Sequence, residues 1–342
     1  MSTRNTIFFH LSALLLLMGC SKEKDINSLD PNTVIELEFP THIKKPDHTV
    51  QLTKNKMKLG QLLFFDKNLS SNQKVSCESC HKSRFSFADN SSLSPNGVTK
   101  QNLQRNSPPL FNLAWHKNFF WDGGAKNLPS QVLAPLTDAH EMNSKLENIE
   151  KYLKSDAEYV SLFRTVYNAP PSITLLTNAI TAYELSITSF NTSYDLEKKG
   201  KYIFTSSEQK GYNLYTTHCS SCHTEGLFSD YGFHNNGIDS AITAFNSIED
   251  VKRGRNRITL KPNDLQKYKT PSLRNLATTA PYMHDGRFET LEEVINHYAN
   301  GVKKSTTLSD KIPSNGFNLN DDEKDNLISF LHTLNDTESF KK

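Results

Sequence analysis

The chain has few cysteines and little excess charge, and each scarcity excludes a class of protein. Five of its 342 residues are cysteines, and its formal net charge is +2. Four of the five cysteines belong to two copies of one short motif, so none is left for a disulfide framework. The near-neutral charge gives no reason to expect binding to nucleic acid. No stretch shows a strand-like alternation strong enough to propose a sheet.

The repeated motif is Cys-x-x-Cys-His, at residues 77–81 and 219–223. Two thiols three positions apart reach the two vinyl groups of one porphyrin, and the adjoining imidazole then meets the iron. The alternative is a zinc or thiol redox site. It is disfavoured because the pairs are 142 positions apart, whereas a zinc ribbon needs roughly 15–20. The motifs therefore predict two covalent haem c groups, attached through Cys77, Cys80 and His81 and through Cys219, Cys222 and His223.

The N-terminus has the pattern of an export signal. Arg4 precedes an apolar run from Ile7 to Met18, which is too short to cross a bilayer as a helix. The junction that ends at Cys20 resembles a bacterial lipobox, so residues 1–19 are expected to be a lipoprotein-type signal peptide and Cys20 to carry the lipid. An ordinary secretory signal with a chance cysteine is the alternative. Both place the protein on the periplasmic side of a bacterial membrane, where haem is attached covalently.

The rest of the chain is expected to be mostly α. Residues 20–50 carry charges and prolines without periodicity, which predicts a spacer. Apolar residues spaced by three and four predict one helix after an N-cap at Ser172 and another after Asn320. The architecture we expect is two cytochrome c-like domains with one haem c each, over 51–195 and 196–342, with the boundary near 192–205. The basic cluster at 252–257 is expected to be a solvated loop, with a docking patch as the alternative.

Several segments carry a resemblance to a known family. They are residues 59–66, the first haem motif, 105–108, 120–123, 270–275 and 280–286. In this order they resemble the bacterial di-haem cytochrome c peroxidase and MauG family, over residues 52 to 335. The resemblance implies that hydrogen peroxide is reduced at the N-terminal haem. Electrons would enter through the C-terminal haem from a small donor protein of the cytochrome c or cupredoxin type.

The resemblance also implies roles for single residues near the first haem. His81 would be the proximal ligand of the peroxide-reducing haem, and His223 that of the electron-transfer haem. Glu141, twenty residues after Trp121, falls where the family has its distal glutamate, and Gln131 and Pro135 fall at further distal positions. Trp121 would lie between the haems and relay electrons. His140 is expected to be structural.

The first haem is expected to have an open face. Many peroxidases of the family carry a loop histidine that closes this face until the second haem is reduced. Here no histidine lies between His81 and His116. We therefore predict a five-coordinate first haem in the resting oxidised protein, as in MauG.

The sixth ligand of the second haem is expected to be Tyr298, which lies fourteen residues after His284, as the family's spacing implies. Met283 is the competing candidate, and His297 is a weaker third. An anionic tyrosinate would lower the haem potential and make a higher-valent state more accessible than methionine would.

Family members also hold a calcium ion between the domains. The corresponding residues here are Asn106, Thr279 and Pro281, and oxygen ligands suit this cation.

Three functions follow. The leading one is a di-haem cytochrome c peroxidase. The second is a MauG-like oxidase that modifies a protein partner through a bis-haem high-valent state, and the third is a non-catalytic electron carrier with two closed haems. Membrane contact is expected only through the lipid, and whether two chains form a homodimer is left open.

Overall fold

The computed structural model describes residues 34, 35, 37, 39–46, 52–240, 250–336, 338 and 339. The expected signal peptide and Cys20 lie outside this part. The described part is mostly helical, as expected, and none of its helices is both long and apolar enough to span a membrane. Its α-helices are α1 Lys54–Phe65, α2 Leu128–Thr137, α3 Leu146–Ser155, α4 Ala157–Tyr167, α5 Ile173–Ser186, α6 Ser193–Lys198, α7 Ser206–His218, α8 Asn256–Thr259, α9 Leu291–Asn296 and α10 Asp321–His332.

Two antiparallel strand pairs add to the helices, and the sequence pattern did not predict them. The first joins β1 Val34–Ile35 to β2 Leu52–Thr53, and the second joins β3 Phe233–His234 to β4 Tyr268–Lys269. Each strand has two residues, which is too short for a period of two to appear in the sequence.

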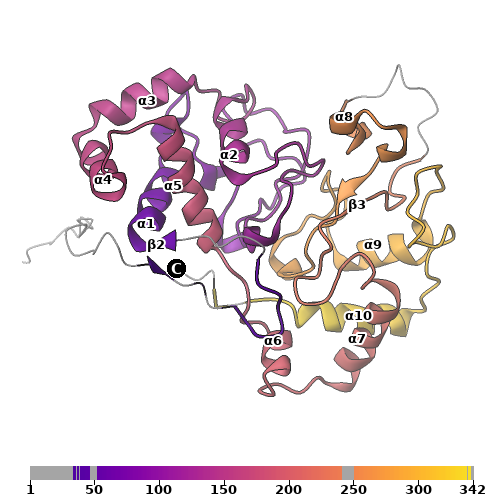
Figure 1. Cartoon of the computed structure of the whole chain (residues 1–342). Coiled ribbons are helices and arrows are strands. Elements are labelled where there is room, and N and C mark those ends of the chain that lie inside the picture. The colour runs from indigo at the N-terminus through magenta and orange to yellow at the C-terminus, as the bar shows by residue number, and fades with distance from the viewer. Residues whose placement is uncertain are drawn as a thin grey trace, which may run out of the picture.

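In the N-terminal half, α1 crosses α5 at very short range (Figure 1). A side-chain carbon added to Gly60 on α1 would lie 1.9 Å from the carbonyl oxygen of Ala179 on α5. Only glycine permits this approach. The N-terminus of α5 is capped by Ser172, whose side chain accepts a hydrogen bond from the backbone of Leu175, so the predicted cap and helix are confirmed.

The C-terminal half repeats this plan with α7 and α10, which lie side by side in Figure 1. A side-chain carbon at Gly211 on α7 would lie 1.9 Å from the carbonyl oxygen of Asn326 on α10. Asn320 and Glu323 form a capping box at the start of α10, which confirms the second predicted helix. One glycine-mediated crossing in each half gives two similar units, as expected for two cytochrome c-like domains.

Each unit has a hydrophobic core of its own. The first core contains buried residues from Leu52 to Ile187, and the second contains buried residues from Tyr194 to Leu334. The chain passes between them over residues 188–193. Tyr194 already packs in the second core, two residues before the expected start of the second domain at 196.

The expected spacer is not free of contacts over residues 39–46. The ring of Phe39 packs edge-on against Trp115 and Phe190, and the indole of Trp115 donates a hydrogen bond of 2.7 Å to the carbonyl oxygen of Lys44. Ile43 is 5% exposed. Residues 39–46, called the strap below, therefore lie against the protein and shorten the spacer. Their apolar residues bury surface that a solvated linker would leave in water.

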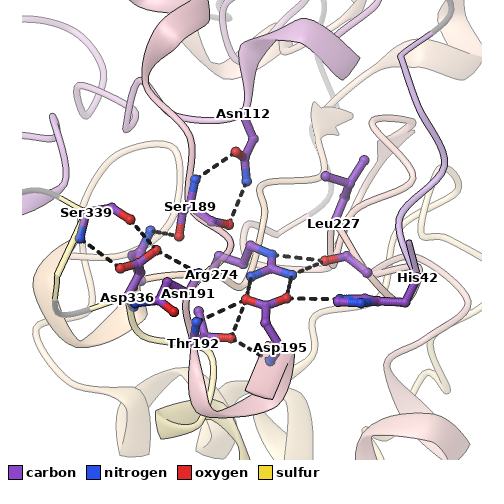
Figure 2. A network of polar contacts seen from close by, with 12 residues as sticks. His42, Asn112, Ser189, Asn191, Thr192, Asp195, Leu227, Arg274, Asp336 and Ser339 are labelled. Atoms are coloured by element: carbon purple, nitrogen blue, oxygen red, sulfur yellow. Dashed lines mark hydrogen bonds and ion pairs between the residues drawn. The ribbon is translucent and has the colours of Figure 1, made fainter. Parts of the chain in front are cut away.

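A buried polar network holds the strap and the interdomain segment to the second domain (Figure 2). The guanidinium of Arg274 donates to both oxygens of Asp195, each at 2.8 Å, and also to the carbonyl oxygen of Gly226. Both charged side chains are fully buried. His42 of the strap lies 3.0 Å from the same carboxylate, and Thr192 donates to it from the interdomain segment. One carboxylate thus joins the strap, the interdomain segment and the second domain.

Candidate haem sites and the segment between them

The first haem motif forms a tight turn. Its residues Cys77–Ser79 make a short 3-10 helix, and the backbone N–H of His81 donates to the carbonyl oxygen of Cys77 at 2.9 Å. Nδ1 of His81 lies 3.0 Å from the carbonyl oxygen of Phe87. Since a carbonyl only accepts, Nδ1 carries the proton and Nε2 keeps its lone pair. Burial lowers the pKa of His81, so the ring is neutral, as an iron ligand must be.

The second motif repeats this geometry. Helix α7 ends directly at Cys219, and the N–H of His223 donates to the carbonyl oxygen of Cys219 at 2.9 Å. Nδ1 of His223 lies 3.1 Å from the carbonyl oxygen of Phe228, and burial lowers the pKa of this histidine as well. Both histidines therefore offer Nε2 to an iron, and both motifs fit a covalently bound haem.

A cavity lies beside the second motif. It is walled mostly by apolar side chains, and its lining includes Cys219, Cys222 and His223 together with Trp121, Met283 and Tyr298. An apolar cavity next to two cysteines and an available imidazole is what a buried haem requires. Asp230 and His234 also approach Cys222. In the haem-loaded protein the sulfur of Cys222 would be a thioether, which is a weaker metal ligand than a thiolate.

Both expected sixth ligands of the second haem reach this cavity. The side-chain amide of Asn236 lies 3.3 Å from the hydroxyl of Tyr298 and 3.5 Å from the sulfur of Met283. Burial raises the pKa of Tyr298 to about 12, so the phenol is neutral until a metal binds it. His297 does not line the cavity, and its Nε2 lies 3.0 Å from the carbonyl oxygen of Asn236. The geometry leaves Tyr298 and Met283 as candidates and disfavours His297.

The expected distal residues of the first haem gather on α2 and the turn that follows it. Glu141 is close enough to both Cys77 and Cys80 for its charge to raise the pKa of each thiol. Burial, with a contribution from the charge of Asp138, raises the pKa of Glu141 to about 7. The side-chain oxygen of Gln131 is buried without a hydrogen-bond partner among the described residues.

Pro135 lies on the same helix. It stabilises the turn through its backbone and makes no polar side-chain contact. Its carbonyl oxygen accepts from the N–H of Met142 at 3.0 Å, which returns the chain beside α2. His140 is exposed.

The loop after the first motif is attached to this distal turn. The N–H of Val98 donates to the carbonyl oxygen of Glu141 at 2.8 Å. A side-chain carbon at Gly97 would lie 1.8 Å from the carbonyl oxygen of His140, so this contact requires glycine. On the other side, the hydroxyl of Ser94, which is fully buried, lies 3.4 Å from the sulfur of Cys80. The loop therefore connects the first haem attachment to Glu141.

Trp121 lies at the junction of the two domains. Its side chain is 9% exposed and lines the second cavity. The indole N–H donates to the carbonyl oxygen of Asn106 at 2.9 Å, and the N–H of Asn106 donates to the carbonyl oxygen of His284. The carbonyl oxygen of Trp121 accepts from the N–H of Lys269. Trp121 is thus held through its indole by its own domain and through its backbone by the second domain.

Two arginines of the basic cluster contact the first domain, which the sequence did not predict. Arg257 donates to the fully buried carboxylate of Asp122, and Arg105 pairs with the same carboxylate at 2.8 Å. The guanidinium of Arg255 donates to the backbone carbonyl oxygens of Asp122 and Gly123, both at 2.9 Å. The prediction of a solvated loop is therefore incomplete. The side chain of Arg257 is 42% exposed, but both arginines also bond to the first domain, where Arg257 helps to compensate a buried carboxylate.

The chain matches two families along its length. Residues 54–202 match the family described as di-haem cytochrome c peroxidase, and residues 208–335 match cytochrome c. The methylamine utilization protein MauG of Methylorubrum extorquens is 33% identical over 288 residues, which cover 83% of this chain and 79% of that protein. The chain belongs to the di-haem cytochrome c peroxidase and MauG family. It is therefore an oxidoreductase with two haem c domains.

Other members of the family are similarly related to this chain. The cytochrome c551 peroxidase of Pseudomonas aeruginosa is 30% identical, over 83% of this chain and 79% of its own length. The crystal structure of a MauG-like protein associated with microbial copper homeostasis superposes with a TM-score of 0.81. That protein is 32% identical, and the match covers 90% of this chain and 97% of that one. Peroxidase and MauG names occur together among the relatives, so family membership alone does not choose between the two activities.

The residues expected to bind calcium fit an oxygen-rich site in part. Asn106 and Thr279 are buried. The side-chain nitrogen of Asn106 donates to the carbonyl oxygens of Ser91 and Ser92, which leaves its side-chain oxygen for a cation. Pro281 follows a cis peptide bond and lies two residues after Thr279.

Sequence reasoning missed two buried groups near the sites. Lys269 lies 3.1 Å from Nδ1 of His116, and burial lowers its pKa to about 7 against the opposing charge of Asp122. No local pattern marks this lysine. Glu184 is the second group, and it did have a signal: it continues an apolar stripe of α5 with a charged residue.

Proposed function

We propose that this protein reduces hydrogen peroxide at the N-terminal haem with electrons that a small redox protein delivers through the C-terminal haem. The position and the pKa of Glu141 carry the proposal. Its carboxyl group is near both cysteines of the first motif, and its pKa is about 7. Such a group can take and return a proton at neutral pH, as cleavage of the peroxide O–O bond requires. The bound haem supplies the electrons for this cleavage.

The protein's own residues divide the remaining work. Gln131 offers a buried, unpartnered polar group beside the distal turn, suited to orient a peroxide. The loop through Ser94 and Val98 holds Glu141 near the haem attachment. Trp121, fixed by Asn106 at the junction of the domains, is suited to pass electrons between the two sites.

The test is the Glu141→Gln variant of the haem-loaded protein. The measurement is peroxide-dependent oxidation of a reduced small cytochrome c, followed by stopped-flow absorbance. Because glutamine cannot accept the proton, the rate should fall by about a hundredfold or more. His140→Gln is the matched control, since this neighbour is exposed and should leave the rate unchanged. An unchanged rate in Glu141→Gln would refute the assignment.

A second candidate function, oxidation of a protein partner as in MauG, is supported by Tyr298. This phenol lines the second cavity, and a tyrosinate ligand would favour oxidised iron. One equivalent of peroxide added to the fully oxidised protein distinguishes the two functions in electron paramagnetic resonance. Loss of both ferric signals supports the MauG-like function, and loss of the first-haem signal alone supports the peroxidase.

We also propose that the protein is exported and tethered through a lipid on Cys20, and that Asn106, Thr279 and Pro281 bind calcium. Cys20→Ser should release the protein from membranes, which fractionation would detect. Elemental analysis of the purified protein should find one calcium per chain, and Asn106→Ala should lose it. Retention of the membrane-bound fraction in the first variant, or absence of calcium from the wild type, would contradict these assignments.

A further inference from the structure

Glu184 is a carboxyl group buried in the wall of the first domain. It continues a stripe of α5 at a spacing of four after Leu176 and Ile180, both fully buried. Glu184 is itself 3% exposed. Its Oε2 atom is enclosed and has no hydrogen-bond partner among the described residues. A buried carboxylate without a partner is unfavourable by several kcal/mol, so the protonated form is favoured. Burial raises the pKa to about 8, and near and above this pH the carboxylate is populated and can take up a proton.

The acid lies beside the first haem attachment. After burial, the charge of Glu184 is the largest influence on the thiol of Cys77, ahead of that of Cys80. Helix α5, which carries Glu184, packs between α1 and α2 (Figure 1), and the turn with Cys77 packs on α1. When haem is attached, Glu184 is therefore in the wall next to it.

No neighbouring charge offsets the effect of burial on the pKa of this carboxyl group. The elements packed on α5 bring these ionisable groups: Lys54, Lys56 and Lys58 from α1, and Glu147, Glu150, Lys151, Tyr152 and Lys154 from α3. Helix α2, β2 and the turn at Leu113–Trp115 bring no ionisable side chain. Tyr183 is adjacent on α5. None of these contributes to the shift of Glu184, which has burial as its sole cause.

We propose that Glu184 is a second acid of the first haem site, which takes up a proton from solvent when that haem gains an electron and releases it when the haem is oxidised. The electron comes from a one-electron donor, and the one bond that forms is the O–H bond of the carboxyl group. An added electron raises the proton affinity of a nearby carboxylate, because the two negative charges interact through a medium of low dielectric constant. The proposal rests on the proposed function in one respect, the attachment of haem at Cys77.

Glu184 and Glu141 would have different tasks. Glu141 is partly exposed on a turn and is suited to proton transfer with peroxide. Glu184 is enclosed in a helix and is suited to balance the charge of the haem. The two acids approach Cys77 from different elements, so each can be replaced alone.

The test is a spectroelectrochemical titration of the first haem in the intact di-haem protein, from about pH 5 to about pH 10. In the wild type, the potential should fall with rising pH around pH 8. The slope is limited to about 59 mV per pH unit, since a tenfold change in the equilibrium constant of a one-electron couple equals that value. Glu184→Gln should lose this slope. Glu147→Gln, at an exposed carboxylate of α3, is the matched control and should keep it. A slope around pH 8 that is unchanged in Glu184→Gln would overturn the proposal.

An infrared difference spectrum between the reduced and oxidised protein gives a second reading. The carbonyl stretch of a protonated carboxyl group should change with oxidation state near pH 8, shift in heavy water and vanish in Glu184→Gln. Absence of this band from the wild type would also overturn the proposal. Neither measurement uses peroxide. If peroxide reduction fails while the Glu184-dependent slope is present, the proposed function alone is wrong.

Discussion

The ion pair between Arg274 and Asp195 predicts a large loss of stability when one partner is removed. In Asp195→Ala, the guanidinium of Arg274 would remain fully buried and would keep only the carbonyl oxygen of Gly226 as a hydrogen-bond acceptor. Removal of one partner of a buried pair costs about 3–5 kcal/mol. The rings of Phe190 and Phe228, at 5.2 and 5.5 Å from the guanidinium carbon, offset part of this cost. We therefore expect a loss near the lower end, about 3 kcal/mol.

The assay is urea unfolding of the haem-loaded protein at pH 7, followed by far-ultraviolet circular dichroism. Asp321→Asn is the control, because this carboxylate also pairs with a cation, Lys324, but its side chain is 96% exposed. Exposed pairs contribute little, so the control should unfold like the wild type. A loss below about 1 kcal/mol in Asp195→Ala would refute the reasoning, since that is the range of surface pairs.

The same pair predicts a pH dependence of known sign. Burial alone would raise the pKa of Asp195, but the hydrogen bonds and charge of Arg274, with those of Thr192, outweigh burial and lower it from 3.8 to about 2. A lowered carboxyl pKa stabilises the folded state above the unfolded value, and this stabilisation is lost as the pH falls through the folded value. About 2 kcal/mol should therefore disappear between pH 4 and pH 2. Asp195→Ala should lack this component.

Three further predictions concern the haem sites. Since Glu141 must start as a carboxylate, the rate of the peroxide reaction should fall as the pH falls below about 7. In a stopped-flow pH profile, Asp138→Asn should shift the midpoint to lower pH, and an unshifted midpoint would contradict the role of Asp138. Gly97→Ala should displace the backbone of His140 and slow peroxide reduction at least tenfold. The spectrum of the second haem should not change, and a wild-type rate would show that the loop does not hold Glu141. Tyr298→Phe should change the spectrum and potential of the oxidised second haem, and Met283→Leu should not; the reverse outcome would assign methionine as the ligand.

Local signals in the sequence predicted the elements that depend on local interactions. The helices after Ser172 and Asn320 have a capping residue and an apolar spacing that both lie within a short stretch of sequence, so that stretch is enough to predict each helix. The haem motifs are local for the same reason. The fold class also followed, because two such motifs on a helical chain favour one architecture.

Contacts between distant segments could not be read in this way. The carboxylate of Asp122 takes its cations from Arg105 and Arg257, and Asp195 takes Arg274 and His42, over separations that no periodicity encodes. The strap was expected to be a spacer because its prolines and charges resemble a linker, although Phe39 and Ile43 find apolar partners. Glu184 could have been found, since a glutamate in the apolar stripe of a helix is an exception to the pattern that predicts the helix.

The hydrogen bonds from His81 to Phe87 and from His223 to Phe228 have a consequence for the order of assembly. Each ring is oriented by a backbone carbonyl of its own loop, at 3.0 and 3.1 Å. Most of the rotational entropy of each ring is therefore lost when the chain folds, and little remains to be lost when iron binds. The polypeptide thus selects which nitrogen becomes the ligand, and the metal arrives at a donor already aligned for it.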